Sequence, residues 1–442
     1  MHHFSAFLAA RPRSLLAAAG LLALPLLLAN GPSPAAQQMG PHGAALETRQ
    51  LAELERLLPG RPAPSAPPHV DPASWRARFP EGRVPTAGQA ELGRRLFFDP
   101  RLSKDDTVSC ATCHDVTRAF ADRRPVSEGI QGQLGRRNAP TVMNAALLSP
   151  LFWDGRAADV ETQALMPLTN PIEMGFADPA EALARIGRIA EYTAAFEEQF
   201  PDGLTFENVG RALGAFQRTL IFLEAPFDRF LAGDEQALSA PARAGWALFN
   251  GRAGCATCHP LSPATPLGTD QRFHNLGVVA QPTKLSGLAE QVLATLAADP
   301  SEAELDRLAL ATDLSDLGRF MQTRERADIG AFKTPQLRNV GLTAPYMHDG
   351  SMITLWDVVD HLGRGGQPHE HQSPLLAPLE LEEAEVEALV AFLFSLTDRR
   401  FAEFNQQQFE FQRRRAGLRR PFRAEPPPKP EAPAPGEPPA GS

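Results

Sequence analysis

The pentapeptide Cys-Ala-Thr-Cys-His occurs twice in this 442-residue chain, at residues 110–114 and 255–259, and the two copies contain all four cysteines. Two thiols followed at once by an imidazole form the attachment signal for c-type haem. The thiols add to the haem vinyl groups, and the histidine binds the iron from the same turn. We therefore expect two covalently bound haems, held by Cys110, Cys113 and His114 in the first copy and by Cys255, Cys258 and His259 in the second.

Three other uses of these cysteines are open at the level of sequence, namely a redox-active pair, half of a zinc site, or disulfides. A thioredoxin-like pair does not require a histidine directly after its second cysteine. A zinc site made of four thiolates would not require histidines at the same offset in both motifs. A repeated match that leaves no cysteine over favours haem.

The N-terminus is typical of an exported protein. Arg11 and Arg13 precede an apolar run at 15–28, and small residues follow at 33–36. The run is short for a membrane span, so we interpret residues 1–36 as a cleaved signal peptide and expect a periplasmic protein. An uncleaved segment would instead anchor the chain in the membrane. Export agrees with the cofactor, because bacteria attach c-type haem outside the cytoplasm.

The charge balance argues against nucleic acid as a partner. The chain has 52 acidic and 43 basic residues, for a net charge of −9, and shows no basic patch with interleaved aromatic residues. An acidic surface would instead attract a basic electron-donor protein.

Two related halves make up the centre of the chain. Each half begins with Gly-x-x-Leu-Phe before its haem motif, at Gly93 and at Gly245, and ends in an amphipathic helical pattern, at 209–216 and at 386–392. We therefore expect an all-α fold of two tandem cytochrome c-like haem domains. The 42 prolines and 34 glycines predict long irregular loops between the helices.

The pattern also predicts the domain boundaries. Residues 87–238 form the first haem domain and residues 239–416 the second. Before them, residues 37–86 are a Pro/Ala-rich extension that we expect to be loosely held, and residues 417–442 are a disordered Pro-rich tail. An Ala/Leu-rich insertion at about 282–318 predicts one or two surface helices without chemistry of their own.

At residues 88–397 the chain resembles the bacterial diheme cytochrome c peroxidases and the related MauG enzymes. The resemblance depends on several ordered motifs around the haem signals. They are Phe-Asp-Pro-Arg-Leu-Ser at 98–103, Arg-Asn-Ala-Pro-Thr at 137–141, Trp-Asp-Gly-Arg at 153–156, Glu-Met at 173–174, Thr-Pro-Gln-Leu-Arg-Asn at 334–339 and Thr-Ala-Pro-Tyr-Met-His-Asp-Gly at 343–350.

The resemblance implies that the first haem binds peroxide, that the second relays electrons, and that a calcium ion lies between them. It implies Glu173 and Gln163 as distal groups and Trp153 between the haems. A carboxylate can move the proton that peroxide cleavage requires, whereas an amide can only orient the peroxide. The implied calcium ligands are oxygen atoms, as a hard cation prefers; they are Asn138 and the backbone carbonyls of Thr343 and Pro345.

The chain departs from the family pattern at both irons. Where these peroxidases have a second histidine on the first haem, the aligned residue is Ile130, and no histidine lies between the two haem motifs. The first haem is therefore expected to be five-coordinate or water-bound, as in MauG. At the second haem, Leu362 replaces the methionine or tyrosine ligand. The adjacent His361 is a candidate sixth ligand, but one residue turns a side chain by about 100°, and water or an open site is the alternative.

We interpret the chain as a diheme c-type peroxidase that reduces hydrogen peroxide to water. Its electron donor would be a small c-type cytochrome or a blue copper protein, and homodimers are common among the enzymes that it resembles. The first alternative is a MauG-like oxidase of Trp or Tyr on a partner protein; against it, Ala253 replaces a tryptophan of the MauG route. The second alternative is a diheme electron carrier without catalysis.

Overall fold

The computed structural model describes residues 41–60, 66–79, 84–278, 282–296, 301 and 313–419. The predicted signal peptide and the predicted tail beyond residue 419 lie outside these residues. Helices dominate the described chain, which confirms the all-α class. Their bounds are α1 Pro41–Leu57, α2 Pro72–Arg78, α3 Ala87–Phe98, α4 Cys110–Cys113, α5 Val160–Thr169, α6 Pro179–Gly187, α7 Ala190–Gln199, α8 Phe206–Arg218, α9 Pro226–Leu231, α10 Ala240–Asn250, α11 Leu285–Leu296, α13 Phe320–Thr323, α14 Leu355–Gly363, α15 Glu383–Phe394 and α16 Ala402–Arg419.

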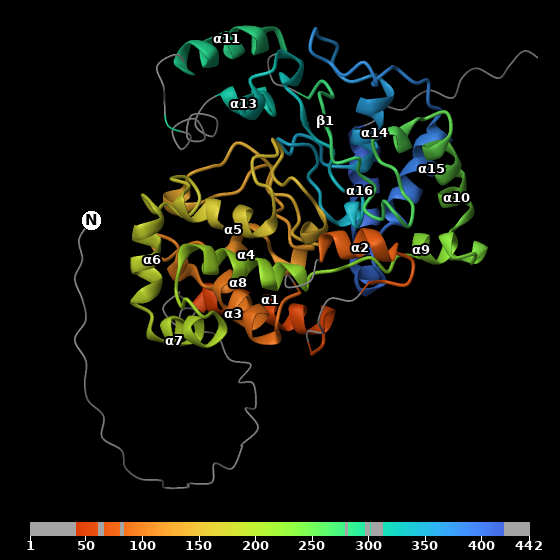
Figure 1. Cartoon of the computed structure of the whole chain (residues 1–442). Helices are drawn as coiled ribbons and strands as arrows, with labels where there is room; N and C mark the ends of the chain where they lie inside the picture. The colour runs from red at the N-terminus through yellow and green to blue at the C-terminus, as the bar shows by residue number, and fades with distance from the viewer. Residues whose placement is uncertain are drawn as a thin grey trace, which may run out of the picture. The chain divides into compact units, whose positions relative to one another are not determined.

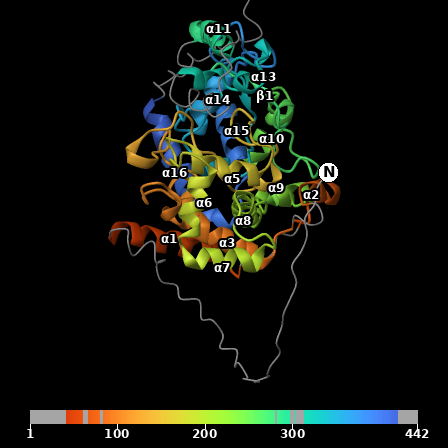
Figure 2. The same ribbon diagram turned by 60° about the vertical axis from the view of Figure 1, so that its left-hand side comes forward.

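The same helix pair occurs in each half. Helix α3, which precedes the first haem motif, packs against α8. Helix α10, which precedes the second haem motif, packs against α15 in the same way (Figures 1 and 2). Glycine permits the close approach in both pairs. A Cβ atom at Gly93 would lie 1.8 Å from the carbonyl oxygen of Ala212, and one at Gly245 would lie 2.0 Å from that of Ala388. The repeated Gly-x-x-Leu-Phe pattern is therefore a helix-packing signal.

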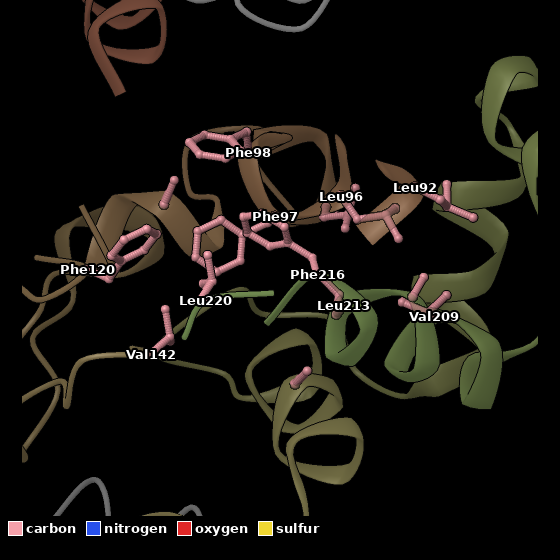
Figure 3. Close-up of a cluster of buried hydrophobic side chains, with 14 of the residues drawn as sticks. Leu92, Leu96, Phe97, Phe98, Phe120, Val142, Val209, Leu213, Phe216 and Leu220 are labelled. Atoms are coloured by element: carbon pink, nitrogen blue, oxygen red, sulfur yellow. The ribbon is translucent and has the colours of Figure 1, made fainter. Parts of the chain in front are cut away.

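Aromatic side chains fill each helix pair beside its haem motif. The ring centroids of Phe97 and Phe216 are 5.1 Å apart, and those of Phe249 and Phe392 are 5.0 Å apart. Figure 3 shows the first of these clusters, where leucines of α3 face apolar residues of α8. The ring of Phe97 also lies 6.5 Å from that of His114, so the helix pair forms one wall of the first haem site. The two helix pairs belong to different apolar clusters, and the first cluster also includes Leu342 and Phe401 of the second half, so the domain boundaries remain a prediction.

The expectation of a loosely held extension is wrong for residues 41–58. These residues form α1 and the turn after it, and they bury Leu54, Leu57 and Leu58 in the first core. The side chain of Gln50 donates to the carbonyl of Ala111 at 3.3 Å and accepts from the amide of Val116 at 3.1 Å. The high proline and alanine content of the segment obscured a short apolar stripe at helical spacing, which fixes α1 against the first haem motif.

The insertion at 282–318 contains helix, as predicted. A 3-10 turn at Pro282–Lys284 leads into α11, and a second 3-10 helix spans Asp313–Leu317. Leu285, Ala289 and Val292 recur at helical spacing and are buried in a small core of their own. Within the described residues, no helix is both long and apolar enough to cross a membrane.

A single two-stranded antiparallel ladder is present in the described chain. Strand β1, Phe273–His274, pairs with β2, Phe332–Lys333, so that Phe273 lies opposite Lys333. The two strands follow the second haem motif and precede the Thr-Pro-Gln-Leu-Arg-Asn segment. They bring these two parts of the second half together.

We expect Gly93→Ala and Gly245→Ala each to lower the free energy of unfolding by about 1–3 kcal/mol, because the new methyl group meets a backbone carbonyl that cannot move independently of its helix. Urea unfolding of the haem-loaded protein would measure this change. Gly287→Ala in α11 is the control, since a Cβ atom there meets no atom within 4 Å. Equal stability of the three variants would contradict the packing argument.

Candidate active site

Both haem-binding histidines are oriented by a backbone carbonyl. The Nδ1 atom of His114 lies 3.3 Å from the carbonyl oxygen of Phe120, and that of His259 lies 2.8 Å from that of Gly268. A hydrogen bond at Nδ1 fixes the ring tautomer and leaves Nε2 as the free ligand atom. Because this arrangement occurs in both Cys-x-x-Cys-His motifs, the residues fit two c-type haems.

The thiol groups do not resemble a redox-active pair. Burial raises the pKa of Cys110 and of Cys113 to about 12, and the pKa of Cys255 to about 11. A redox-active pair requires a thiolate, and therefore a lowered pKa. Burial also lowers the pKa of both haem-binding histidines, which keeps each imidazole in the neutral form that binds iron.

The cysteines do not form a four-thiolate zinc site in the described chain. The one group of metal-binding side chains found there consists of Cys258, Asp270 and His274, and it contains a single cysteine. The Nε2 atom of His274 lies 2.9 Å from an oxygen of Asp270, whose amide donates to the carbonyl of Cys258. These contacts support the turn that follows the second haem motif and give His274 a structural role.

Glu173 lies beside the first haem motif. It follows α5 in a turn closed by Asn170, whose side-chain amide donates to the Glu173 carboxylate at 3.2 Å. The Glu173 charge contributes to the raised pKa of both Cys110 and Cys113, after the larger effect of burial. The carboxylate is therefore close enough to act on this site electrostatically.

Ile130 is a buried residue of the same loop system. Its amide donates to the carbonyl of Glu173 at 3.0 Å, and its side chain is 4% exposed. Gly175, with φ +81°, makes room for it, because a Cβ atom there would lie 2.1 Å from Ile130 Cδ1. Position 130 thus supplies packing to the Glu173 turn.

Gln163 lies on α5, where it is half-buried. The buried face of this helix carries Val160, Ala164 and Leu168. The role of Gln163 as the second distal group remains a prediction.

Trp153, Asn138 and His348 form a contact between the two halves. The indole Nε1 of Trp153 donates to the carbonyl of Asn138 at 2.9 Å, and the amide of Asn138 donates to the carbonyl of His348 at 2.7 Å. The rings of Trp153 and His348 meet edge to face with their centroids 6.5 Å apart. Trp153 thus lies at the junction of the halves, and its place between the haems remains a prediction.

The same turn is built twice at this junction. Residues 144–157 and 339–352 share a left-handed Asn, a cis proline, a second left-handed residue and a left-handed Gly at matching positions. In this alignment His348 corresponds to Trp153. The internal repeat therefore places one aromatic ring from each half in contact with the other, which the sequence analysis did not detect.

The predicted calcium ligands are only partly brought together. Asn138 reaches the 343–350 segment at His348, and its side-chain nitrogen donates to the carbonyl of Pro125 at 3.1 Å. Thr343 Oγ1 donates to the carbonyl of Val340, and Pro345 is buried. Within the described residues no hydrogen bond joins Asn138 to Thr343 or Pro345, so the calcium site remains a prediction.

The side chain of His361 already has a hydrogen-bond partner. Its Nε2 atom lies 2.9 Å from the carbonyl oxygen of Leu276, which leaves only Nδ1 for another ligand. His348 differs, because its Nε2 is buried and has no hydrogen-bond partner in the described chain. Burial and the nearby Arg137 lower the pKa of His348 to about 3, so its ring is neutral.

A buried carboxylate that the sequence analysis missed holds the junction together. Asp154 accepts from Arg137 at 2.6 Å and from Arg156 at 3.0 Å. The Asp154 carbonyl also accepts from Arg319 at 2.9 Å, and Arg137 donates to the carbonyl of Ser315. Burial alone would raise the pKa of Asp154, but Arg156 and Arg137 outweigh it and lower the pKa to about 2. An acidic residue two positions before an arginine in the Trp-Asp-Gly-Arg motif was the available signal.

We expect Asp154→Asn to lower the free energy of unfolding by about 3–5 kcal/mol at neutral pH, because two buried guanidinium groups lose their counter-charge. The folded-state pKa is below the unfolded value, so the carboxylate stabilises the fold above about pH 4, and this stability is lost as the pH falls towards about 2. Urea unfolding at several pH values measures both effects. Glu207→Gln, in an exposed pair with Arg211, is the control and should change stability by less than about 1 kcal/mol.

Comparison with known proteins agrees with this geometry. The family model of the di-haem cytochrome c peroxidases matches residues 87–236. The chain is 38% identical over 321 residues to the cytochrome-c peroxidase IdrP2 of Denitromonas iodatirespirans, which covers 72% of this chain and 84% of that protein. It is also 38% identical over 314 residues to the methylamine utilization protein MauG of Methylophilus methylotrophus, with 70% and 83% covered.

A solved structure has the same fold. It is a MauG-like protein associated with microbial copper homeostasis, with a TM-score of 0.59, 32% identity, and coverage of 76% of this chain and 94% of that one. Sequence and structure thus agree over most of the two-haem region. The chain belongs to the di-haem cytochrome c peroxidase family.

Proposed function

We propose that this protein reduces hydrogen peroxide to water at the first haem with electrons that enter at the second. Glu173 carries this proposal, because the Ile130 amide holds its turn and its neighbour Met174 is buried in the same core as Ala111 of the first haem motif. Relatives named as cytochrome c peroxidases support it. Bound haem supplies the iron that takes up peroxide and the electrons that reduce it.

The proton transfer is assigned to Glu173. Cleavage of peroxide requires that a proton leave the inner oxygen and reach the outer oxygen, which then departs as water. A carboxylate can accept and return that proton. Asn170 holds one carboxylate oxygen, and the Ile130 amide holds the backbone of Glu173, so the group is oriented before peroxide arrives. Gln163 would orient the outer oxygen from α5.

Access to the first iron follows from Ile130. Its aliphatic side chain cannot bind iron, and residues 115–258 contain no histidine that could take its place. Peroxide would therefore meet a free coordination position in the fully oxidised protein.

Trp153 is proposed to assist electron transfer between the haems. Its indole is anchored on Asn138, its ring meets His348, and its carbonyl accepts from the amide of Lys333 at 2.7 Å. These contacts connect it directly to the second half.

The remaining assignments are proposals at a finer level. The donor would be a small c-type cytochrome or a blue copper protein, which the net charge of −9 would attract if the donor is basic. Export to the periplasm agrees with c-type haem attachment. A calcium ion bound by Asn138 and nearby carbonyls would stabilise the junction of the halves.

A MauG-like oxidation of Trp or Tyr on a partner protein is the second candidate. Ile130 favours it, since it leaves the first iron open, and a relative named MauG supports it. Ala253, partly buried in the second core, replaces the tryptophan of the MauG route, and Leu362 replaces its tyrosine ligand. These two residues make the peroxidase the better-supported function.

We expect Glu173→Gln to lower the rate of peroxide-dependent cytochrome c oxidation by about 10²–10⁴-fold, because the amide keeps the shape of the side chain but cannot move the proton. Haem content and visible spectra should be unchanged. Glu181→Gln is the control from the same region, since Glu181 forms a surface pair with Lys104. Full activity of the Glu173 variant would exclude this residue as the proton carrier. Oxidation of a partner polypeptide without cytochrome c turnover would favour the MauG-like function.

A further inference from the structure

Lys333 is a buried cation without a buried counter-charge. Its side chain lies in β2, and the residue is only 6% exposed. The ammonium group has one hydrogen bond, to the carbonyl of Thr334 at 3.5 Å, and in the described chain no carboxylate lies within ion-pair distance of it. A buried charge is normally paired, because leaving it unpaired is costly.

The acidic group that acts on Lys333 is already engaged. Asp270 attracts Lys333 electrostatically, but its two carboxylate oxygens are bonded to His274 Nε2 and to the amide of Arg272, both at 2.9 Å. Burial lowers the pKa of Lys333 to about 8, and Arg78 adds to this effect. The ammonium group is therefore still mostly protonated at neutral pH and requires an anion.

The ladder directs Lys333 towards the second haem motif. Neighbouring residues of a strand point to opposite faces. Phe332 uses one face to stack on His348, with the ring centroids 3.6 Å apart, so Lys333 occupies the other. The carbonyl of Thr334, which accepts from Lys333, also accepts from the hydroxyl of Thr269 at 2.7 Å. The next residue, Asp270, donates its amide to the carbonyl of Cys258 at 2.8 Å, so these contacts connect Lys333 to the second haem motif.

We propose that Lys333 binds a carboxylate of the second haem and raises the reduction potential of that haem. This rests on the proposed function, in which the second haem relays electrons. A haem carboxylate is the anion that the second site itself supplies, and it would complete the charge balance that the protein leaves open. A fixed positive charge beside the haem favours the ferrous state, which carries one positive charge fewer.

This assignment also addresses the missing sixth ligand. Leu362 stands where a methionine thioether would favour ferrous iron. The positive charge of Lys333 would partly replace the effect of the thioether, because it also favours ferrous iron. The second haem could then accept electrons from a small redox protein without the thioether ligand.

The test is spectroelectrochemical titration of both haems in the haem-loaded protein and its variants. We expect Lys333→Met to shift the ferric–ferrous equilibrium of the second haem at least tenfold towards ferric, which is about 59 mV for one electron. The first haem should not shift. Lys333→Arg retains the charge and should stay near the wild-type potential. Lys284→Met removes an exposed lysine of the same half and is the matched control.

An unchanged second-haem potential in Lys333→Met would overturn the proposal. An equal shift in Lys284→Met would also overturn it, because the effect would then reflect net charge alone. If the methionine variant does not load haem, Lys333→Gln provides the same test with a neutral polar side chain. Peroxide turnover is measured separately, so a failure of the wild-type protein to oxidise cytochrome c would contradict the proposed function without changing the potential shift.

Discussion

The function depends first on the orientation of two imidazole rings. Each Cys-x-x-Cys-His motif fixes the position of its histidine, but the carbonyls of Phe120 and Gly268 decide which ring nitrogen faces the iron. Both carbonyls lie in loops, whose conformation depends on the helices that pack beside them. The support comes from helix pairs that approach closely at Gly93 and Gly245. In the first half it also comes from α1, whose Gln50 bonds Ala111 within the first motif and Val116 just after it.

The junction between the halves is the second constraint. The proposed electron transfer requires that the two haem sites keep a fixed distance, and the repeated turn contributes contacts between the halves from both copies. Trp153 and His348 occupy equivalent places in the two copies and touch each other. The buried carboxylate of Asp154, next to Trp153, forms ion pairs with Arg137 and Arg156. The stability of the fold and the position of the proposed relay residue therefore depend on the same few contacts.

The features that local sequence patterns encode were predicted from the sequence. The haem motifs, the all-α class, the paired helices and the helical insertion follow from spacing and periodicity, and the structure agrees with them. Contacts between distant segments were not predictable in the same way. The packing of α1 was missed because its apolar stripe is short. The Asp154 cluster was missed because Arg137 comes 17 residues before Asp154, and Arg319, which bonds the Asp154 carbonyl, is much more distant in sequence. The role of Lys333 required knowledge of its burial, which a two-residue strand does not reveal.

Ile130 makes the central claim directly testable. Hydrogen peroxide is added to the fully oxidised, haem-loaded protein together with reduced cytochrome c, and cytochrome c oxidation is followed from the first turnover. Because residues 115–258 offer the first iron no second histidine, turnover should begin without a lag and without prior reduction of either haem. A lag that disappears only after the second haem has been reduced would contradict an open first site.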